Sequence, residues 1–162
     1  MKSNGAARPK PPDCSGKRFA IVVARFYGEL ADMLVDGAAR ALADCHAGEV
    51  ETFDVPGCFE LPVACRNLID TDRFDAIVAL GVVVRGETPH FDFVAGECAR
   101  GIMDVQLATG VPIGFGVLTT ETIAQAQERA DPARGDKGYE AGVAAATVLR
   151  ITSSVARAGF RA

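Results

Sequence analysis

The sequence has no apolar run long enough to cross a membrane and no apolar segment near its start. The longest apolar run, from Ala76 to Val84, is far shorter than the roughly 20 residues that a membrane-spanning helix needs. The first 16 residues are rich in Lys, Pro and Gly and lack the apolar core of a secretory signal. We therefore expect a cytoplasmic protein that does not enter a membrane.

The sequence also lacks an excess of basic residues. It has 17 Lys and Arg against 21 Asp and Glu, which gives a formal net charge of −4. Nucleic acids and anionic membrane surfaces attract proteins through concentrated positive charge. We expect neither as a partner, and any phosphate group must be bound by a few local residues.

Cysteine and histidine are too few and too irregularly spaced to indicate a disulfide framework or a metal site. The chain has five cysteines, no C-x-x-C pair and two histidines. We expect most of the cysteines to be small buried residues in a reducing compartment, and we predict no metal.

The length of 162 residues and the apolar content of 49% predict a single domain. We assign it to residues 17–162, after a flexible arm over residues 1–16. Four runs predict β-strands, at Phe19–Ala24, Glu49–Val55, Ala76–Val84 and Val111–Leu118. Helical spacing predicts helices over about 30–42, 61–68, 89–108, 121–130 and 139–157.

This alternation of strands and helices predicts an α/β fold. A four-stranded parallel sheet with crossover helices on both faces gives a three-layer α/β/α sandwich of the flavodoxin-like type. Binding sites in such folds lie at the carboxyl ends of the strands. The segments that follow the strands are therefore the first place to look for chemistry.

The segment after the third strand predicts an anion site. Gly86 permits close backbone approach, Thr88 is a favourable N-cap, and Pro89 suits the first helical position. The N-terminus of a helix attracts anions through its unpaired amides and its dipole. His90 would lie in the first turn, where the dipole favours a neutral ring that can accept a proton. An ordinary strand-to-helix turn with a packed or solvated histidine is the alternative.

Other strand ends carry groups that suit a polyol, a heterocycle and a phosphate. Glu60 can accept hydrogen bonds, and Phe26 and Phe59 can form a flat apolar wall. Arg129 and Lys137 flank the segment DPARGDK and can bind a phosphate together. The alternative for Glu60 is an ordinary acidic residue in the first turn of a helix. The alternative for the two phenylalanines is packing in the core, and for the two cations it is solvation at the surface.

Taken in order, these segments resemble the lumazine synthase family from about Arg18 to the last helix. The motifs are A-R-F at 24–26, V-P-G-C-F-E-L-P at 55–62, D-A-I-V-A-L-G-V-V-V-R-G-E-T-P-H-F-D at 75–92, G-V-P-I-G-F-G-V-L-T-T-E at 110–121, Q-A-Q-E-R-A at 125–130 and D-K-G at 136–138. Each motif alone is weak, but the ordered set is highly specific.

The resemblance implies a role for each matching residue. The ribitylamino-uracil is bound by Phe26, Cys58, Phe59, Glu60, Val82, Val83, Val84, Phe115 and Lys137. The sugar phosphate is bound by Glu87, Thr88 and Arg129, and His90 transfers protons. Phe115, Arg129 and Lys137 come from the adjacent subunit in the family, so the resemblance places the site between two chains.

The resemblance also implies the reaction and the assembly. Family members join 5-amino-6-(D-ribitylamino)uracil to 3,4-dihydroxy-2-butanone 4-phosphate without a metal or cofactor. They form homopentamers, and some form decamers or sixty-subunit shells, a choice in which the loop at 131–137 is implicated. We favour a pentamer or paired pentamers here. Cys58 stands where alanine is frequent, which suggests a pocket sensitive to thiol reagents.

Two other classes fit parts of the sequence. A non-catalytic flavin- or lumazine-binding homologue, or a shell subunit, would bind ligand tightly without turnover. A signalling receiver domain of similar topology would need acidic residues after the first strand, where this chain has Arg25 and Phe26.

Overall fold

The structure is a computed structural model that describes the backbone of residues 10–158 and the side chains as far as Ile151. The first nine residues of the predicted N-terminal arm lie outside the described residues. Near the end of the arm, Cys14 is buried, and its amide donates to the carbonyl oxygen of Cys45 at 2.7 Å. This contact holds the start of the domain against the end of the first helix.

In the described part of the chain, four strands form one parallel sheet, as the sequence predicts. They are β1 (Arg18–Ala24), β2 (Glu49–Val55), β3 (Ala76–Val84) and β4 (Ile113–Thr120), in the spatial order β2-β1-β3-β4. β3 is buried over nearly its whole length, which accounts for its almost unbroken Val, Ile and Leu run. β4 begins two residues later than predicted, after Pro112, because proline has no backbone N–H to donate to a neighbouring strand.

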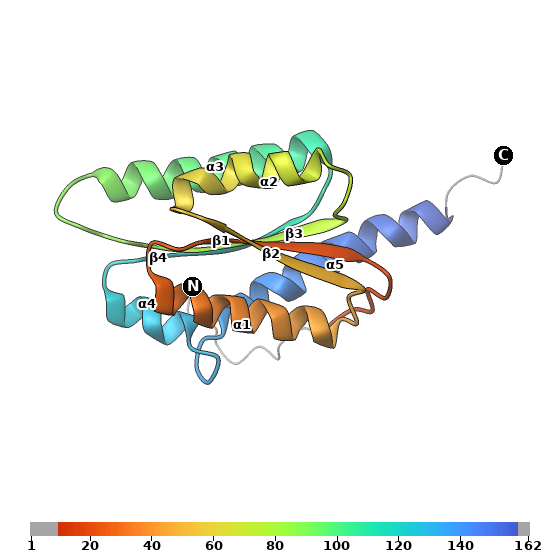
Figure 1. Cartoon of the computed structure of the whole chain (residues 1–162), viewed down its shortest axis with the longest axis horizontal. Coiled ribbons are helices and arrows are strands. Elements are labelled where there is room, and N and C mark those ends of the chain that lie inside the picture. The colour runs from red at the N-terminus through yellow and green to blue at the C-terminus, as the bar shows by residue number, and fades with distance from the viewer. Residues whose placement is uncertain (1–9, 159–162) are drawn as a thin grey trace.

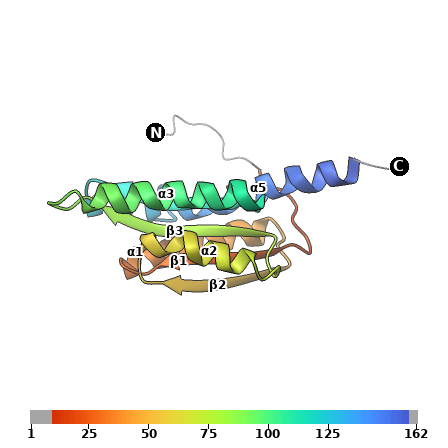
Figure 2. The same ribbon diagram turned by 90° about the horizontal axis from the view of Figure 1, so that it is seen from above.

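Within residues 10–158, five α-helices cover the two faces of the sheet and confirm the predicted three layers (Figure 1; Figure 2). One face carries α1 (Gly28–Asp44), α4 (Ile123–Ala130) and α5 (Lys137–Ala158), and the other carries α2 (Leu61–Ile69) and α3 (His90–Thr109). The last turns of α5 extend beyond the sheet in both views. Within the described residues, no helix combines the length and the apolar character that crossing a membrane requires.

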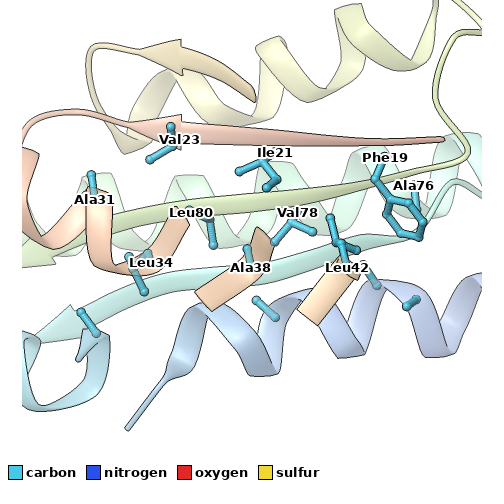
Figure 3. Packing of buried hydrophobic residues seen from close by; sticks show 14 of the residues in the cluster. Phe19, Ile21, Val23, Ala31, Leu34, Ala38, Leu42, Ala76, Val78 and Leu80 are labelled. Carbon is cyan, nitrogen blue, oxygen red and sulfur yellow. The ribbon is translucent and has the colours of Figure 1, made fainter. Parts of the chain in front are cut away.

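Alternation along the strands supplies two separate cores. Phe19, Ile21 and Val23 of β1 point towards α1 and α5, where they pack with residues such as Leu34 and Leu42 (Figure 3). The intervening residues of β1 are smaller and pack beneath α2 and α3. Full burial of each large aliphatic or phenyl side chain stabilises the fold by about 1.5–3 kcal/mol.

The helices on the α1 face lie very close to their neighbours. A Cβ at Gly114 in β4 would overlap the carbonyl oxygen of Ala141 in α5, and a Cβ at Gly138 would overlap that of Leu34 in α1. Because these positions admit only glycine, the start of α5 is fixed against both the sheet and α1.

His46 lies just beyond the end of α1 and helps to end the helix through its backbone. It adopts a left-handed conformation with φ of 56°, and its amide donates to Ala43 at 2.9 Å. The amide of Ala47 then donates to Leu42 at 3.0 Å, which completes a Schellman motif. His46 lines neither of the two surface hollows described below.

Candidate active site

A surface hollow lies at the carboxyl ends of β1 and β3, and we call it the first hollow. Its volume is about 520 Å³. It is lined by Phe26, Tyr27, Gly57, Cys58, Phe59, Glu60, Val82, Val83, Val84, Gly86, Thr88, His90, Phe91, Phe93 and Val94. Here the chain leaves β1 towards β2 on one side and later returns to β3 on the other, which is where ligands bind in open α/β sheets.

The end of β3 presents backbone groups to this hollow. β1 pairs with β3 only as far as Leu80, whereas β4 pairs with β3 up to Val84. The last residues of β3, Val82–Val84, therefore have no β1 partner on their other edge. An unpaired strand edge offers amides and carbonyls in an alternating row, which suits the polar edge of a pyrimidine.

Exposed aromatic rings surround the same space. The exposed fractions are 75% for Phe26, 60% for Phe59 and 66% for Phe93, although such large apolar side chains are usually covered. Tyr27 packs edge-on against Phe26 with ring centres 5.0 Å apart and limits the movement of that ring. A flat heterocycle can cover these faces.

Cys58 closes the floor of the first hollow, but its thiol is not poised to react. Its side chain is only 4% exposed, and Sγ lies 3.8 Å from the carbonyl oxygen of Val82. Burial raises the pKa of the Cys58 thiol to about 12. Because the thiolate is the reactive form, we expect Cys58 to resist thiol reagents in the folded protein, contrary to the expectation from the sequence. All five cysteines are buried and free, in agreement with the sequence.

Glu60 is the carboxylate among the lining residues. It ends a 3-10 turn over Cys58–Glu60, one residue before α2 begins, and Oε2 lies 3.1 Å from the place a Cβ on Gly57 would take. Glycine at this position leaves room for the carboxylate, which is exposed and able to accept hydrogen bonds from hydroxyl groups.

The turn before α3 differs by one residue from the prediction. Pro89, not Thr88, occupies the N-cap, and no side chain caps the helix. Pro89 has a φ of −69° and a ψ of 6°, and His90 is the first helical residue. Thr88 and His90 line the hollow and are exposed, whereas Glu87 is exposed but is not among the lining residues.

Arg85, at the start of this turn, forms ion pairs with two carboxylates of the protein. Its guanidinium donates to both oxygens of Asp92 in α3 at 3.2 Å and lies 2.9 Å from Glu121 at the end of β4. It also stacks on Phe91, with its central carbon 4.2 Å from the ring centre. These contacts raise the pKa of Arg85, chiefly through the bond to Asp92. Arg85 therefore connects α3 with the end of β4. Because its charge is balanced by two carboxylates, it is not a free cation for a phosphate at this turn.

The second hollow lies between β4 and the helices α4 and α5 and has a volume of about 480 Å³. Phe115, Arg129 and Lys137 all line it. The guanidinium of Arg129 donates to the carbonyl of Gln125 at 3.1 Å, and Arg129 forms no ion pair among the described side chains. Lys137 pairs with Glu140 at 2.6 Å. This hollow carries positive charge that the first hollow does not.

The structure thus divides the predicted site residues between two places. The residues predicted to bind the ribitylamino-uracil from the ends of β1, β2 and β3 all line the first hollow, together with Thr88 and His90. The three residues that the resemblance assigns to an adjacent subunit, Phe115, Arg129 and Lys137, line the second hollow. Tyr27, Phe91, Phe93 and Val94 also line the first hollow and were not predicted from the sequence. Each lies within four residues of Phe26 or His90, and this closeness in sequence could have indicated them.

Comparison with known proteins assigns the family. Residues 16–153 match the sequence profile of 6,7-dimethyl-8-ribityllumazine synthase. The chain belongs to the 6,7-dimethyl-8-ribityllumazine synthase family. Three similar proteins carry that name, from Erythrobacter litoralis (53% identical, over 83% of this chain and 94% of the relative), Cutibacterium acnes (48%, over 91% and 89%) and Nitratidesulfovibrio vulgaris (45%, over 86% and 90%).

The motifs that resemble the lumazine synthase family fall into two groups, and each group lines one of the two hollows. Those at 24–26, 55–62 and 75–92 supply the lining of the first hollow, and those at 110–121, 125–130 and 136–138 supply residues of the second. Both hollows are therefore built from family segments, although they lie apart in one chain.

Proposed function

We propose that the protein condenses 5-amino-6-(D-ribitylamino)uracil with 3,4-dihydroxy-2-butanone 4-phosphate, forming 6,7-dimethyl-8-ribityllumazine, phosphate and water. Membership of the family supports the activity. The observation that carries the proposal is the complementarity of the two hollows. One has aromatic faces and an unpaired strand edge for a pyrimidine, and the other has cations for a phosphate.

In this proposal, the uracil ring stacks on Phe26 and its polar edge meets the backbone of Val82–Val84. The ribityl chain lies against the 3-10 turn, where the Glu60 carboxylate accepts hydrogen bonds from its hydroxyl groups. Cys58 and Phe59 complete the surface beneath it. These contacts fix the amine that attacks the ketone.

The phosphate group requires positive charge that the first hollow lacks. No lysine or arginine is among its lining residues, and Arg85 nearby is paired with two carboxylates. We infer that the second hollow of a neighbouring copy supplies Arg129, with Lys137 and Phe115 facing the pyrimidine. Each active site then lies between two subunits of a homo-oligomer, which we propose to be a pentamer or paired pentamers in the cytoplasm.

The chemistry is a condensation followed by an elimination. The amine adds to the ketone and loses water to form an imine, loss of the phosphate follows, and the ribitylamino nitrogen closes the ring with loss of a second water. His90, exposed at the start of α3, moves protons between these steps. Holding both reactants in one orientation supplies a large part of the acceleration.

A two-substrate assay tests the activity. Purified protein is mixed with both substrates, and the lumazine chromophore and phosphate release are followed against a protein-free control. We expect a rate well above the spontaneous condensation. Tight binding of the lumazine without such a rate would instead support a non-catalytic homologue.

A further inference from the structure

The segment that joins α4 to α5 contains a buried carboxylate in an unusual backbone conformation. Asp136 is 0% exposed and has a φ of +49°, in the left-handed region that few residues other than glycine adopt. A buried carboxylate is costly unless charge and hydrogen bonds compensate it. The conformation of this segment therefore depends on contacts made by Asp136.

Arg40, in the last turns of α1, makes one such contact across 96 residues of sequence. Its two terminal nitrogens donate to the two carboxylate oxygens of Asp136, at 2.7 Å to Oδ1 and 3.3 Å to Oδ2. The third nitrogen, Nε, donates to Asp36 on the same helix at 2.9 Å. The two-point contact fixes direction as well as distance, which a single point charge cannot do.

The segment held in this way is tightly fitted to Arg129. The amide of Gly135 donates to the carbonyl of Glu128 at 2.9 Å, and a Cβ at Gly135 would lie 2.7 Å from the Cα of Arg129. On its other side Asp136 is followed directly by Lys137, the first residue of α5. A displacement of Asp136 would therefore move both cations of the second hollow.

We propose that Arg40 is a positioning residue that holds Arg129 and Lys137 in place through Asp136. Arg40 lines neither hollow, so it acts on the substrate only through these residues. The inference rests on the proposed function, in which the second hollow binds the phosphate group for a neighbouring copy. Its consequence is that a residue of α1 sets the affinity for the sugar phosphate.

The test is the Arg40→Met variant of the full chain, with Asp36→Asn as the matched control. Asp36→Asn removes the negative charge of the exposed partner of Arg40 and leaves the contact with Asp136. KM for each substrate is measured with the other saturating. We expect Arg40→Met to raise KM for the sugar phosphate by roughly tenfold, through Arg129, and to raise KM for the ribitylamino-uracil by a clearly smaller factor, through Lys137. Asp36→Asn should behave as the unaltered protein.

Arg40→Lys separates positioning from general support of the fold. Lysine restores the charge but not the two-point contact, so we expect an intermediate KM for the sugar phosphate. A purely structural role would lower the active fraction, and hence kcat, without a selective change in one KM. An Arg40→Met variant with an unchanged KM for the sugar phosphate, or with both KM values raised equally, would overturn the inference.

Two further variants keep the outcomes distinct. Asp136→Asn preserves size and an acceptor oxygen but removes the charge, so it should raise KM for the sugar phosphate by a smaller factor than Arg40→Met. It takes the place of Arg40→Met as the test if that variant does not fold. Arg129→Ala tests the hollow itself. If Arg129→Ala leaves KM for the sugar phosphate unchanged, the proposed function of the second hollow fails. If Arg129→Ala raises it and neither Arg40→Met nor Asp136→Asn does, the positioning role alone fails.

Discussion

Phe26 and Arg129 line different hollows of the same chain, one at the ends of β1 and β3 and the other beside β4. The proposed reaction needs both, since one faces the pyrimidine and the other the phosphate. The proposed reaction therefore needs a second copy of the chain, and substitutions in each hollow should affect different substrates.

Replacing Arg129 with alanine should weaken sugar-phosphate binding selectively. A charged hydrogen bond contributes about 1.5–3 kcal/mol, so kcat/KM for the sugar phosphate should fall by roughly 10- to 100-fold. Arg134→Ala is the control, because Arg134 is exposed on the same segment but is not among the residues that line the second hollow. Equal effects of the two substitutions would argue against a specific phosphate site.

Replacing His90 with alanine should slow turnover more than it weakens binding. A positioned proton-transfer group commonly contributes about 10²-fold or more, but substrate positioning carries much of this reaction, so we expect kcat to fall by about tenfold. His46→Ala provides the control, since His46 ends α1 away from both hollows. Steady-state kinetics over a range of pH measure both variants. A normal kcat for His90→Ala would remove it from the mechanism.

Cys58 should resist alkylation in the folded protein despite its place in the first hollow. A thiol with a pKa of about 12 has about a thousandfold less thiolate at pH 8 than a free cysteine. Since deprotonation creates the nucleophile, labelling by iodoacetamide should keep rising with pH well beyond 9. Peptide mass spectrometry before and after unfolding in guanidinium reports the labelling. Rapid modification of Cys58 at pH 8 in the folded state would contradict the burial.

Replacing Arg85 with methionine should loosen the turn that precedes His90. The guanidinium connects Asp92 with Glu121, so its loss frees the start of α3 from the end of β4. We expect kcat/KM for the sugar phosphate to fall by about tenfold. Arg100→Met is a matched control, because Arg100 bridges Glu97 and Asp104 on the exposed surface of the same helix. The same loss in both variants would indicate a general effect of charge on α3.

The strand pattern and the layer order could be predicted because apolar alternation and burial determine them directly. β2 and β3 have the predicted bounds, and β1 begins one residue earlier. The predicted cap at Thr88 was wrong because Pro89 can itself take the N-cap conformation, a choice that depends on the path of the turn and not on residue preference. The start of β4 depended similarly on Pro112.

Within the site, the first hollow followed from the rule that ligands bind at strand ends. The separation of Arg129 and Lys137 from Phe26 did not follow from that rule, because all three lie near strand or helix ends. The family resemblance implies that Arg129 and Lys137 act from an adjacent subunit, and within one chain they line a different hollow from Phe26. The Arg40–Asp136 pair could not be predicted, since 96 residues separate its members and nothing in their local sequence links them.

The shared site is tested most directly by co-assembling two inactive variants. One carries Phe26→Ala, Glu60→Ala and His90→Ala in the first hollow, and the other carries Arg129→Ala and Lys137→Ala in the second. In randomly mixed rings, about a quarter of the sites join an intact first hollow to an intact second hollow. We predict that doubly tagged mixed oligomers recover activity near that level. Activity no greater than that of the separate variants would place the whole site within one chain and contradict the account.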